Sequence, residues 1–303
     1  MSIELLKIPQ PLRYGAALEL QRARGAALEA STDKLATLIL LQHTPVFTLG
    51  RKTGANHLLP DSGDMTRFLP TAVGIWKSGS CPQNPAAEEL AARTGAEVVE
   101  TDRGGSVTFH APGQLTAYLL LNLHAWELTI HAHLDKLEQV AIQTLARFGI
   151  AGRREPRMTG VWVDSGDMTR FQGHDPISPD CGRDLEIGIV SPESSGSPPV
   201  RKSGSCPRNP PAAEKICAIG VSVRRWVTYH GLSLNVDLDL APFLEVVPCG
   251  LAGKAVTSMS RVLGRPVPLP AVEDAMTAAF SEVYGAPLLH HRDTETQRKE
   301  VER

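Results

Sequence analysis

The sequence predicts an α/β protein built on a mixed β-sheet flanked by helices. Two observations carry this prediction. Apolar runs of strand length recur along the chain, and segments whose apolar residues have helical spacing are intermingled with them. The chain has 303 residues, which allows one large domain or two small ones. We expect a single domain over 1–288 and a polar tail over 289–303, because the last residues are nearly all polar.

The first half begins with a helix and continues with strands. Residues 14–30 have the pattern of a moderately amphipathic helix, and two apolar runs, LATLILL and PVFTLG, follow it as strands. The segments SVTFHA (106–111) and LTAYLLLNL (115–123) are the next predicted strands.

The second half is expected to alternate in the same way. Apolar residues recur at helical spacing from Leu134 to Phe148, and GVWVD and ICAIGVSV are predicted to be extended. A last helix presents an apolar face from Val272 to Val283, with Pro270 before it and Gly285 after it.

A repeated sequence motif interrupts the predicted order of strands and helices. DSGDMTRF occurs at 61–68 and 164–171, and a KSGSCP block follows each copy. These segments are rich in Gly, Pro, Ser and Asp and lack an apolar face of their own, so we expect inserted loops at about 61–85 and 165–213 rather than stacked repeats. Lengthening a turn tenfold costs roughly 2 kcal/mol, which a sheet can tolerate. Three explanations of these segments remain open: functional binding loops, tolerated insertions, or an error in gene prediction.

Composition excludes several classes of protein. The net charge is −2, so we expect no nucleic-acid partner. The five cysteines are odd in number and form no CxxC pair, which argues against a disulfide framework or a zinc ribbon and favours a reducing compartment. No apolar run approaches the roughly 20 residues that cross a bilayer, so no membrane is expected. The first residues have no secretory pattern.

The stretch RGGSVTFHAPGQ (103–114) is the first candidate for chemistry. Gly104 and Gly105 can present backbone N–H groups to a carbonyl or phosphate, because no side chain blocks the approach. A Gly-Gly pair is also common in plain hairpin turns, but Arg103 and His110 in the same stretch strengthen the binding interpretation.

The histidines offer weaker signals. His110 and His230 each fit a hydrogen-bonded strand histidine better than a catalyst, and neither has the sequence context of a serine hydrolase. His131 and His133 are two residues apart at the start of a helix, whereas helix faces pair positions three or four apart. We therefore expect no metal site.

Cys249 stands between Pro248 and Gly250 in LEVVPCGLAG. It can be a buried structural thiol, because cysteine packs as a small hydrophobic residue. A proline–glycine turn can instead project the thiol into a cleft, with nearby N–H groups placed for an oxyanion. Composition and spacing alone do not decide between a structural thiol and a nucleophile at Cys249.

Five segments in this order, RGGSVTFHAPGQL, TGVWV, KICAIGVSV, HGLSLNV and VVPCGLAGKAVTS, resemble the lipoyl(octanoyl) transferase family. The resemblance runs from about residue 3 to about 288, apart from the two inserts. It implies a single domain of the biotin/lipoate protein ligase type. It also implies an acyltransferase that moves an octanoyl group from acyl carrier protein to a lysine of a lipoyl domain.

The resemblance also assigns roles. The family's acyl-thioester cysteine and its partner lysine match Cys249 and Lys215. Its acyl-binding segments match fourteen residues: Arg103, Gly104, Gly105, Ser106, Val107, Thr108, Phe109, His110, Ala218, Ile219, Gly220, Gly231, Leu232 and Ser233. A lysine that accepts the thiol's proton must be neutral, so the two catalytic groups are expected to act as a coupled pair.

The implied reaction is ping-pong and needs no cofactor, because a thioester arrives already activated. The donor is octanoyl-acyl carrier protein. The acceptors are lipoyl domains of the E2 subunits of 2-oxoacid dehydrogenases and the glycine cleavage H protein. These partners are acidic, and Arg51, Lys52, Arg224 and Arg225 are candidates for a basic rim that attracts them. We expect a mitochondrial protein if the gene is eukaryotic and a cytoplasmic one if it is bacterial. The inserts slightly favour a eukaryotic gene.

Two departures from the family pattern bear on activity. Ala111 replaces a usual glycine, which strains the turn if that position needs a positive φ. The second insert ends just before Lys215, so fraying of that loop would displace the lysine.

Two other functions remain as alternatives. One is a cysteine-dependent thioesterase or amidase with His110 or His230 as base, and the other is an inactive relative that captures acyl carrier protein. An ATP-dependent ligase is disfavoured, because ligases of this fold use no Pro-Cys-Gly nucleophile.

Overall fold

The computed structural model describes residues 1–29, 31, 33–54, 58, 85–164, 213–246 and 255–290. Eight strands form the main sheet in the order β11-β1-β2-β6-β10-β9-β8-β7, and three form a small sheet in the order β4-β3-β5. Both sheets are mixed, since β1 pairs in parallel with β2 and β11, and β3 with β4, while the other pairs are antiparallel. The predicted fold class is therefore confirmed.

The main sheet takes its strands from both halves of the chain. Its strands are β1 (Ser2–Lys7), β2 (Leu35–Leu41), β6 (Gln114–Leu121), β7 (Arg153–Glu155), β8 (Met158–Asp164), β9 (Ala213–Arg224), β10 (Val227–Asn235) and β11 (Leu288–His290). All eight residues of β6 are buried, because this strand has a neighbour on each side and a layer on each face.

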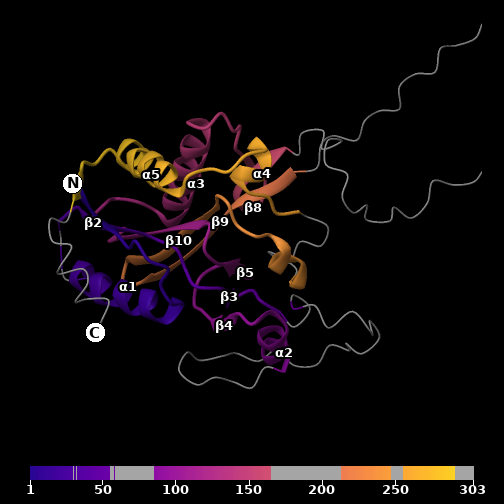
Figure 1. Cartoon of the computed structure of the whole chain (residues 1–303). Coiled ribbons are helices and arrows are strands. Elements are labelled where there is room, and N and C mark those ends of the chain that lie inside the picture. Colours follow the sequence, from indigo (N-terminus) through magenta and orange to yellow (C-terminus); the bar gives the residue numbers. More distant parts are fainter. Residues whose placement is uncertain are drawn as a thin grey trace, which may run out of the picture.

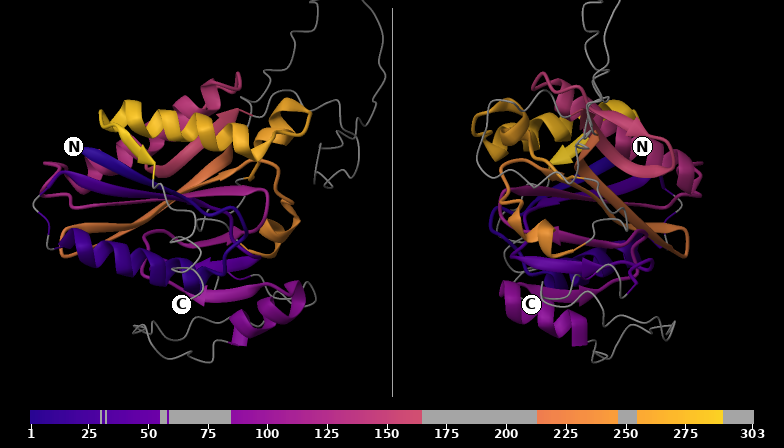
Figure 2. Two further views of the ribbon diagram at one scale, coloured as in Figure 1. Left: turned by 60° about the vertical axis from the view of Figure 1, so that its left-hand side comes forward. Right: turned by 90° about the vertical axis from the view of Figure 1, so that its right-hand side faces the viewer.

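Helices cover both faces of this sheet (Figures 1 and 2). On one face, α3 (Ile130–Ala146) and α5 (Leu269–Tyr284) pack on the largest apolar cluster, which includes Leu119, Leu137 and Phe280. Thr129 caps α3 by accepting a hydrogen bond from the N–H of Ala132, and Gly285 ends α5 with a φ of 63°. Burial of these apolar faces stabilises the layer.

On the other face, α1 (Tyr14–Glu29) packs through a second apolar cluster. Gly25 lies against the ring of Tyr229, and a Cβ at this position would lie 2.3 Å from the tyrosine oxygen. The helix can approach β10 this closely only because residue 25 has no side chain. This contact fixes α1 over the strand that carries His230.

The small sheet lies on the same side as α1 and completes that layer (Figure 2). It consists of β3 (Val46–Leu49), β4 (Glu97–Glu100) and β5 (Val107–His110), and α2 (Pro85–Thr94) and η2 (Ala241–Glu245) pack beside it. A short helix, α4 (Met259–Leu263), connects to α5. None of the helices that the structure describes is long and apolar enough to span a bilayer.

Three details at element boundaries differ from the expectation. Leu289 and His290, which we assigned to the polar tail, form β11 and pair with β1, and the rest of the tail lies outside the described residues. Pro270 lies in the first turn of α5 rather than before it. Pro85 and Ala213, which we assigned to the inserts, begin α2 and β9. The rest of both inserts lies outside the described residues.

The second insert joins two strands that are already paired. Asp164, the last residue of β8, pairs with Ala213, the first residue of β9. We therefore expect that deleting 165–212 and joining the strands through Asn-Gly preserves the fold, because two residues close an antiparallel hairpin. Circular dichroism and octanoyl transfer measured on the shortened chain test this. Complete loss of transfer by a folded variant would mean that the insert takes part in the function.

Candidate functional site

Four small residues form a flat patch on two adjacent strands. Gly220 pairs with Gly231, and Ala218 pairs with Ser233, across β9 and β10. Because side chains alternate along a strand, these four positions face the same side of the sheet. Because these side chains are small or absent, the patch leaves space above the sheet surface. This accounts for the small residues two positions apart in AIG (218–220) and GLS (231–233).

The neighbouring strand β6 extends this patch. Tyr118 pairs with Gly231, and Thr116 pairs with Ser233. Thr116 is 1% exposed, and its Oγ1 has no hydrogen-bond partner among the described residues. A buried hydroxyl of this kind can donate a hydrogen bond to a bound ligand.

The segment that begins at Arg103 lies over the patch. The N–H of Gly104 donates to the carbonyl of Val221 at 3.0 Å, which attaches the segment to β9. A Cβ at Gly220 would lie 2.8 Å from the carbonyl oxygen of Gly104. Because Gly220 has no side chain, the two backbones can approach this closely.

Arg103 holds this segment in place from within. Its side chain is buried, and its Nη2 donates to the carbonyl of Thr48 at 2.6 Å, while Nε donates to Thr48 Oγ1 at 3.1 Å. Such charge-assisted hydrogen bonds are stronger than neutral ones. The guanidinium thus ties the covering segment to β3.

A cavity of about 40 Å³ lies between the patch and the covering segment. It is lined by Lys215 and by twelve of the fourteen predicted binding residues. His230, considered above only as a base for a thioesterase, also lines it, as do three residues that we did not predict: Tyr14, Thr116 and Tyr118. Ligand pockets usually measure roughly 300 Å³ or more, so a ligand must widen this one by moving side chains.

Two predicted binding residues do not line the cavity. Phe109 points into the core of the small sheet, where its ring lies 4.8 Å from that of Phe47 and 5.9 Å from that of Phe243. Gly104 contributes its backbone contact to Val221 instead. Both residues support the covering segment rather than the cavity surface.

Lys215 lies at one end of the cavity and is held on both sides. Its backbone pairs with Trp162 of β8, its N–H donates to the carbonyl of Ala255, and its carbonyl accepts from the N–H of Thr257. The side chain is buried, and its Nζ lies 5.2 Å from the centre of the Trp162 ring, a cation–π distance. Lys215 thus lies within a paired strand and not at a frayed loop end.

Cys249, the predicted nucleophile, lies outside the described residues, as do Cys81, Cys181 and Cys206. The described cysteine, Cys217, is fully buried, and burial raises the pKa of its thiol to about 12. A thiol of this kind stays protonated at neutral pH and is a poor nucleophile.

His230 occupies the other end of the cavity in an unusual conformation. Its φ is 63°, which is rare for a residue with a side chain. Its Nε2 donates to Asp102 Oδ1 at 2.9 Å, and its Nδ1 accepts from the Tyr14 hydroxyl at 3.2 Å. The hydrogen bond from His230 holds the pKa of Asp102 well below its usual range. Burial lowers the pKa of His230, so the imidazole is neutral at pH 7.

Two more histidines surround this end. His43 Nδ1 donates to the carbonyl of Leu12 at 3.0 Å, so its Nε2 accepts from the Tyr118 hydroxyl at 2.6 Å. His110 Nδ1 contacts Gln114 Oε1 at 2.6 Å. Tyr14, His43 and Tyr118 were not predicted. The polar positions Thr116 and Tyr118, two apart in an apolar strand, would have been the signal for a polar face on that strand.

We expect the fold to become less stable in acid because of its buried histidines. Burial lowers the pKa of His43 and of His133 to about 4, while the unfolded chain binds protons near pH 6.5. Between these values the unfolded state holds more protons, so stability is full above pH 6.5 and falls as the pH drops toward 4. Each residue contributes roughly 3 kcal/mol to the full change.

Urea unfolding at pH values from 7 to 4.5 measures this effect. We expect the free energy of unfolding to decrease steadily, and His133→Gln, which removes one of the titrating groups, to flatten the curve. An unfolding free energy that is constant over this range would contradict the assignment of neutral buried histidines.

Ala111 does not need the conformation of a glycine. The described residues with positive φ include Gly113 at 91° but not Ala111. A Cβ at Gly113 would lie 2.3 Å from the carbonyl oxygen of Asp237. The glycine after the proline therefore makes the turn, and the expected strain at Ala111 is absent.

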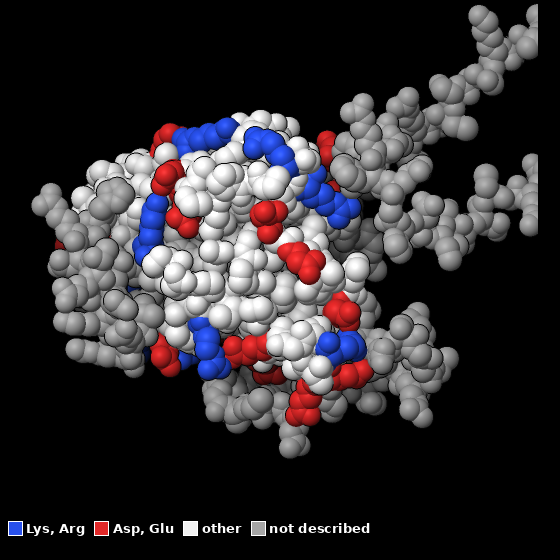
Figure 3. Space-filling model, viewed as in Figure 1, with Lys and Arg blue, Asp and Glu red and all other residues white. Residues whose placement is uncertain are grey.

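The proposed basic rim is partly neutralised. Arg224 pairs with Asp102 at 2.8 Å and Arg225 pairs with Glu29 at 3.0 Å, while Arg51 and Lys52 are exposed beside the covering segment. On the face shown in Figure 3, basic and acidic side chains are interspersed around a broad uncharged area. Among the described residues, no group of three or more His, Cys, Asp and Glu side chains could hold a metal ion.

Comparisons with known proteins match this architecture and most of the chain. The model of the lipoyl protein ligase A/B catalytic domain matches residues 13–281. An octanoyltransferase of Geobacter metallireducens is 34% identical over 89% of this chain and 88% of its own. An octanoyltransferase of Rubrobacter xylanophilus is 32% identical over 94% of this chain and 96% of its own.

Solved structures agree at the level of the fold. A putative lipoate protein ligase from T. acidophilum with bound lipoic acid has a TM-score of 0.60 at 13% identity, over 100% of this chain and 94% of its own. A lipoate-protein ligase A bound with ATP has a TM-score of 0.61 at 12% identity, over 100% of this chain and 93% of its own. At these identities, the likeness is one of fold alone.

Proposed function

The chain belongs to the lipoyl protein ligase A/B catalytic domain family, and we propose that it is an octanoyltransferase that supplies the acyl group for protein lipoylation. Relatives that are 32–34% identical over most of the chain carry the name octanoyltransferase. One structural observation supports this most directly. Three motifs that are far apart in the sequence line one cavity, and the lysine expected to act with the nucleophile lies at its end.

The first half-reaction forms an acyl-enzyme. The thiolate of Cys249 attacks the carbonyl carbon of octanoyl-acyl carrier protein, and the carbon–sulfur bond to the carrier's phosphopantetheine breaks. The carrier leaves as a thiol, having taken the proton that Cys249 lost. The octanoyl group then rests on Cys249 as a thioester, so no ATP is consumed.

The second half-reaction makes an amide. The amine of a lysine on the lipoyl domain attacks the thioester carbonyl, and the bond to Cys249 breaks. The attacking amine loses a proton, and the departing sulfur needs one to return to the thiol. Lys215 is the group that we assign to both transfers, acting with Cys249 as a coupled pair.

The surroundings of Lys215 support this role. The segment that continues from Cys249 returns to Lys215, since Ala255 and Thr257 form backbone hydrogen bonds to it at 2.9 Å each. Ala255 follows Cys249 by six positions in the sequence, and six residue steps span about 20 Å at most. This reach supports our proposal that the thiol acts beside Lys215.

The acyl chain is proposed to lie on the patch of small residues. Ala218, Gly220, Gly231 and Ser233 leave space above β9 and β10, and Ile219, Val107 and Leu232 also line the cavity. Burying each methylene stabilises the complex by about 0.8 kcal/mol. Eight carbons thus contribute several kcal/mol, and the length of the pocket decides which chain fits.

The partners and compartment follow from this proposal. We propose octanoyl-acyl carrier protein as the donor, and lipoyl domains of 2-oxoacid dehydrogenases and the glycine cleavage H protein as acceptors. The relatives named above are bacterial, which favours a cytoplasmic enzyme and gives no support to the mitochondrial alternative.

The thioesterase alternative fits the site less well. Both ring nitrogens of His110 have partners, in Gln114 and Thr48, and both of His230 have partners, in Asp102 and Tyr14. Neither imidazole has a nitrogen available to activate water without breaking one of these contacts. Each histidine is therefore better suited to positioning than to general-base catalysis.

Mass spectrometry of the intact protein separates the three functions. The chain is incubated with octanoyl-acyl carrier protein and weighed, and apo lipoyl domain is then added. A transferase forms an octanoyl adduct that passes to the lipoyl domain. An adduct lost to water as octanoate would indicate a thioesterase, and the absence of any adduct would indicate a binding protein.

A further inference from the structure

We propose that Trp162 is a positioning residue, whose ring holds the amine of Lys215 where it transfers protons. This inference rests on the proposed function, which makes Lys215 the group that exchanges protons with the thiol and with the acceptor amine. Trp162 acts through Lys215 rather than on the acyl group. Three features of β8 and β9 carry the inference: a β-bulge, an aromatic contact and a glycine.

A β-bulge in β9 turns Lys215 toward the pocket. Consecutive residues of β8 pair with Cys217 and with Lys215, so Ile216 is an extra residue in β9. Ile216 and Cys217 both belong to the apolar cluster under α3 and α5, although neighbouring residues of a regular strand face opposite sides. Without the bulge, residue 215 would share the face of Cys217. The extra residue instead places Lys215 on the face of Ala218, where it lines the cavity.

The same register places Trp162 beside Lys215. Residues directly opposite each other on antiparallel strands share a face of the sheet, and Trp162 is the partner of Lys215 on β8. Lys215 Nζ lies 5.2 Å from the centre of the indole ring. The ring is itself fixed, because Trp162 is 1% exposed and its Nε1 donates to the carbonyl of Met158 at 3.3 Å. A desolvated contact of this kind holds the amine at the face of the ring.

Gly160 leaves the space through which the lysine side chain passes. A Cβ at this position would lie 2.6 Å from Lys215 Cε and 3.2 Å from Nζ. The backbone of Gly160 has a φ of 122°, and its N–H donates to Glu138 Oε1 at 3.0 Å, while Arg154 holds the other oxygen of that carboxylate. Strand β8 thus supplies a floor at Gly160 and a wall at Trp162 for the same side chain.

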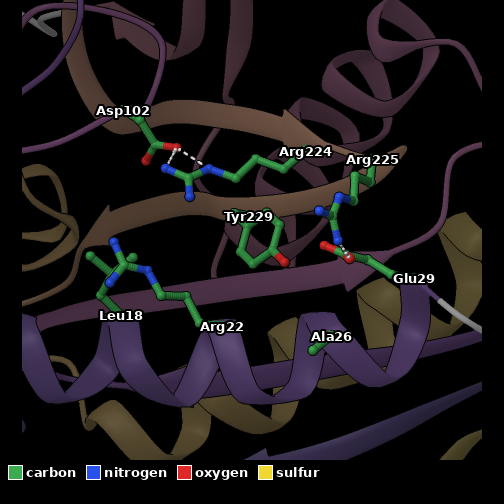
Figure 4. A pocket seen from close by; sticks show the side chains of 8 residues that line it. All are labelled: Leu18, Arg22, Ala26, Glu29, Asp102, Arg224, Arg225 and Tyr229. Carbon is green, nitrogen blue, oxygen red and sulfur yellow. Dashed lines mark hydrogen bonds and ion pairs between the residues drawn. The ribbon is translucent and has the colours of Figure 1, made fainter. Parts of the chain in front are cut away.

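At the other end of β9, charges are held by carboxylates instead of a ring. In the cavity of about 440 Å³ shown in Figure 4, Arg224 pairs with Asp102 at 2.8 Å. In the same cavity, Arg225 pairs with Glu29 at 3.0 Å. Carboxylates suit a guanidinium, which keeps its proton. A ring face attracts an ammonium group but takes no proton from it, so the proton of Lys215 stays available for transfer.

A double-mutant cycle tests whether Trp162 acts through Lys215. We expect Trp162→Leu, which removes the ring, to slow octanoyl transfer to the lipoyl domain about tenfold. Trp162→Phe keeps a ring and should lose about threefold or less. In a Lys215→Met background the amine is absent, so Trp162→Leu should cause no further fall beyond about twofold. Octanoylation of the lipoyl domain, followed by mass spectrometry, measures each rate.

Trp126→Leu is the matched control for the loss of a buried indole. Trp126 is 6% exposed, and its Nε1 donates to the carbonyl of Leu35 in β2, three strands away from β9. We expect this variant to lower the midpoint of urea unfolding, as Trp162→Leu does, but to retain transfer within about twofold. If Trp162→Leu does not fold, the same cycle with Trp162→Phe carries the comparison, because the smaller change keeps the core filled.

The outcomes separate this inference from the proposed function. If the wild type forms no octanoyl adduct, the proposed function fails, and if Lys215→Met transfers at the wild-type rate, the role of Lys215 fails; this inference falls with either. If both hold and the Trp162 substitution slows transfer equally with and without the amine, Trp162 is structural and the inference is overturned. A wild-type rate in Trp162→Leu, or an equal loss in Trp126→Leu, would overturn it too.

Discussion

Replacing Cys249 by serine is expected to lower octanoyl transfer by about 10³-fold or more, as loss of a covalent nucleophile does in other enzymes. A serine hydroxyl is far less acidic than a thiol, so little nucleophile is present at pH 7, and the acyl group no longer rests on a sulfur between the two partners. The rate of lipoyl-domain octanoylation, followed by mass spectrometry, measures the loss.

Cys217→Ala is the matched control for this variant. Cys217 lies two residues beyond Lys215 on β9, but its thiol is fully buried and its pKa is raised to about 12 by burial. We expect this variant to retain transfer and to form the octanoyl adduct. Wild-type-like transfer by Cys249→Ser, or loss of the adduct in Cys217→Ala with the fold intact, would reject Cys249 as the nucleophile.

The second large effect is expected at Lys215. Replacing it by methionine keeps the length of the side chain and its apolar stem but removes the amine. General acid–base groups contribute about 10²- to 10⁴-fold, so we expect transfer to fall within that range. Burial of the site favours methionine, so the variant should fold, which urea unfolding can verify.

A comparison with Lys215→Arg separates the two tasks of this residue. Arginine keeps a positive charge near the thiol but does not release its proton at neutral pH. We expect it to permit acylation of Cys249 better than methionine does while failing to restore turnover. If both variants acylate and turn over like the wild type, Lys215 does not handle the proton.

Much of the fold could be predicted from the sequence. The continuous apolar run of β2 and the long apolar run of β6 form the buried centre of the sheet, as their composition indicated. The edge strand β11 was missed, because its three residues gain their strand conformation from pairing with β1 and carry no pattern of their own. Short elements depend on tertiary pairing more than on local sequence.

The candidate site was predictable only in part, for a related physical reason. The glycine pair in RGGSVTFHAPGQ indicated a binding segment, and the residues of the patch came from the family resemblance. The polar end of the pocket could not be read from the sequence, because Tyr14 and Tyr118 lie in a helix and a strand and His43 lies between β2 and β3. These segments meet only in the folded protein. The unusual conformation of His230 was also hidden, since backbone φ is not readable from residue identity.

The distance between Cys249 Sγ and Lys215 Nζ tests the central claim most directly. It is best measured in a crystal structure of the chain with an octanoyl group trapped in the pocket. We predict that the two atoms lie within about 6 Å of each other, the range in which one charge shifts the proton affinity of another. We also predict that the acyl chain extends from the sulfur over Gly220 and Gly231 toward His230. A sulfur on the opposite face of the sheet from Lys215, or one enclosed without access to the pocket, would contradict this account.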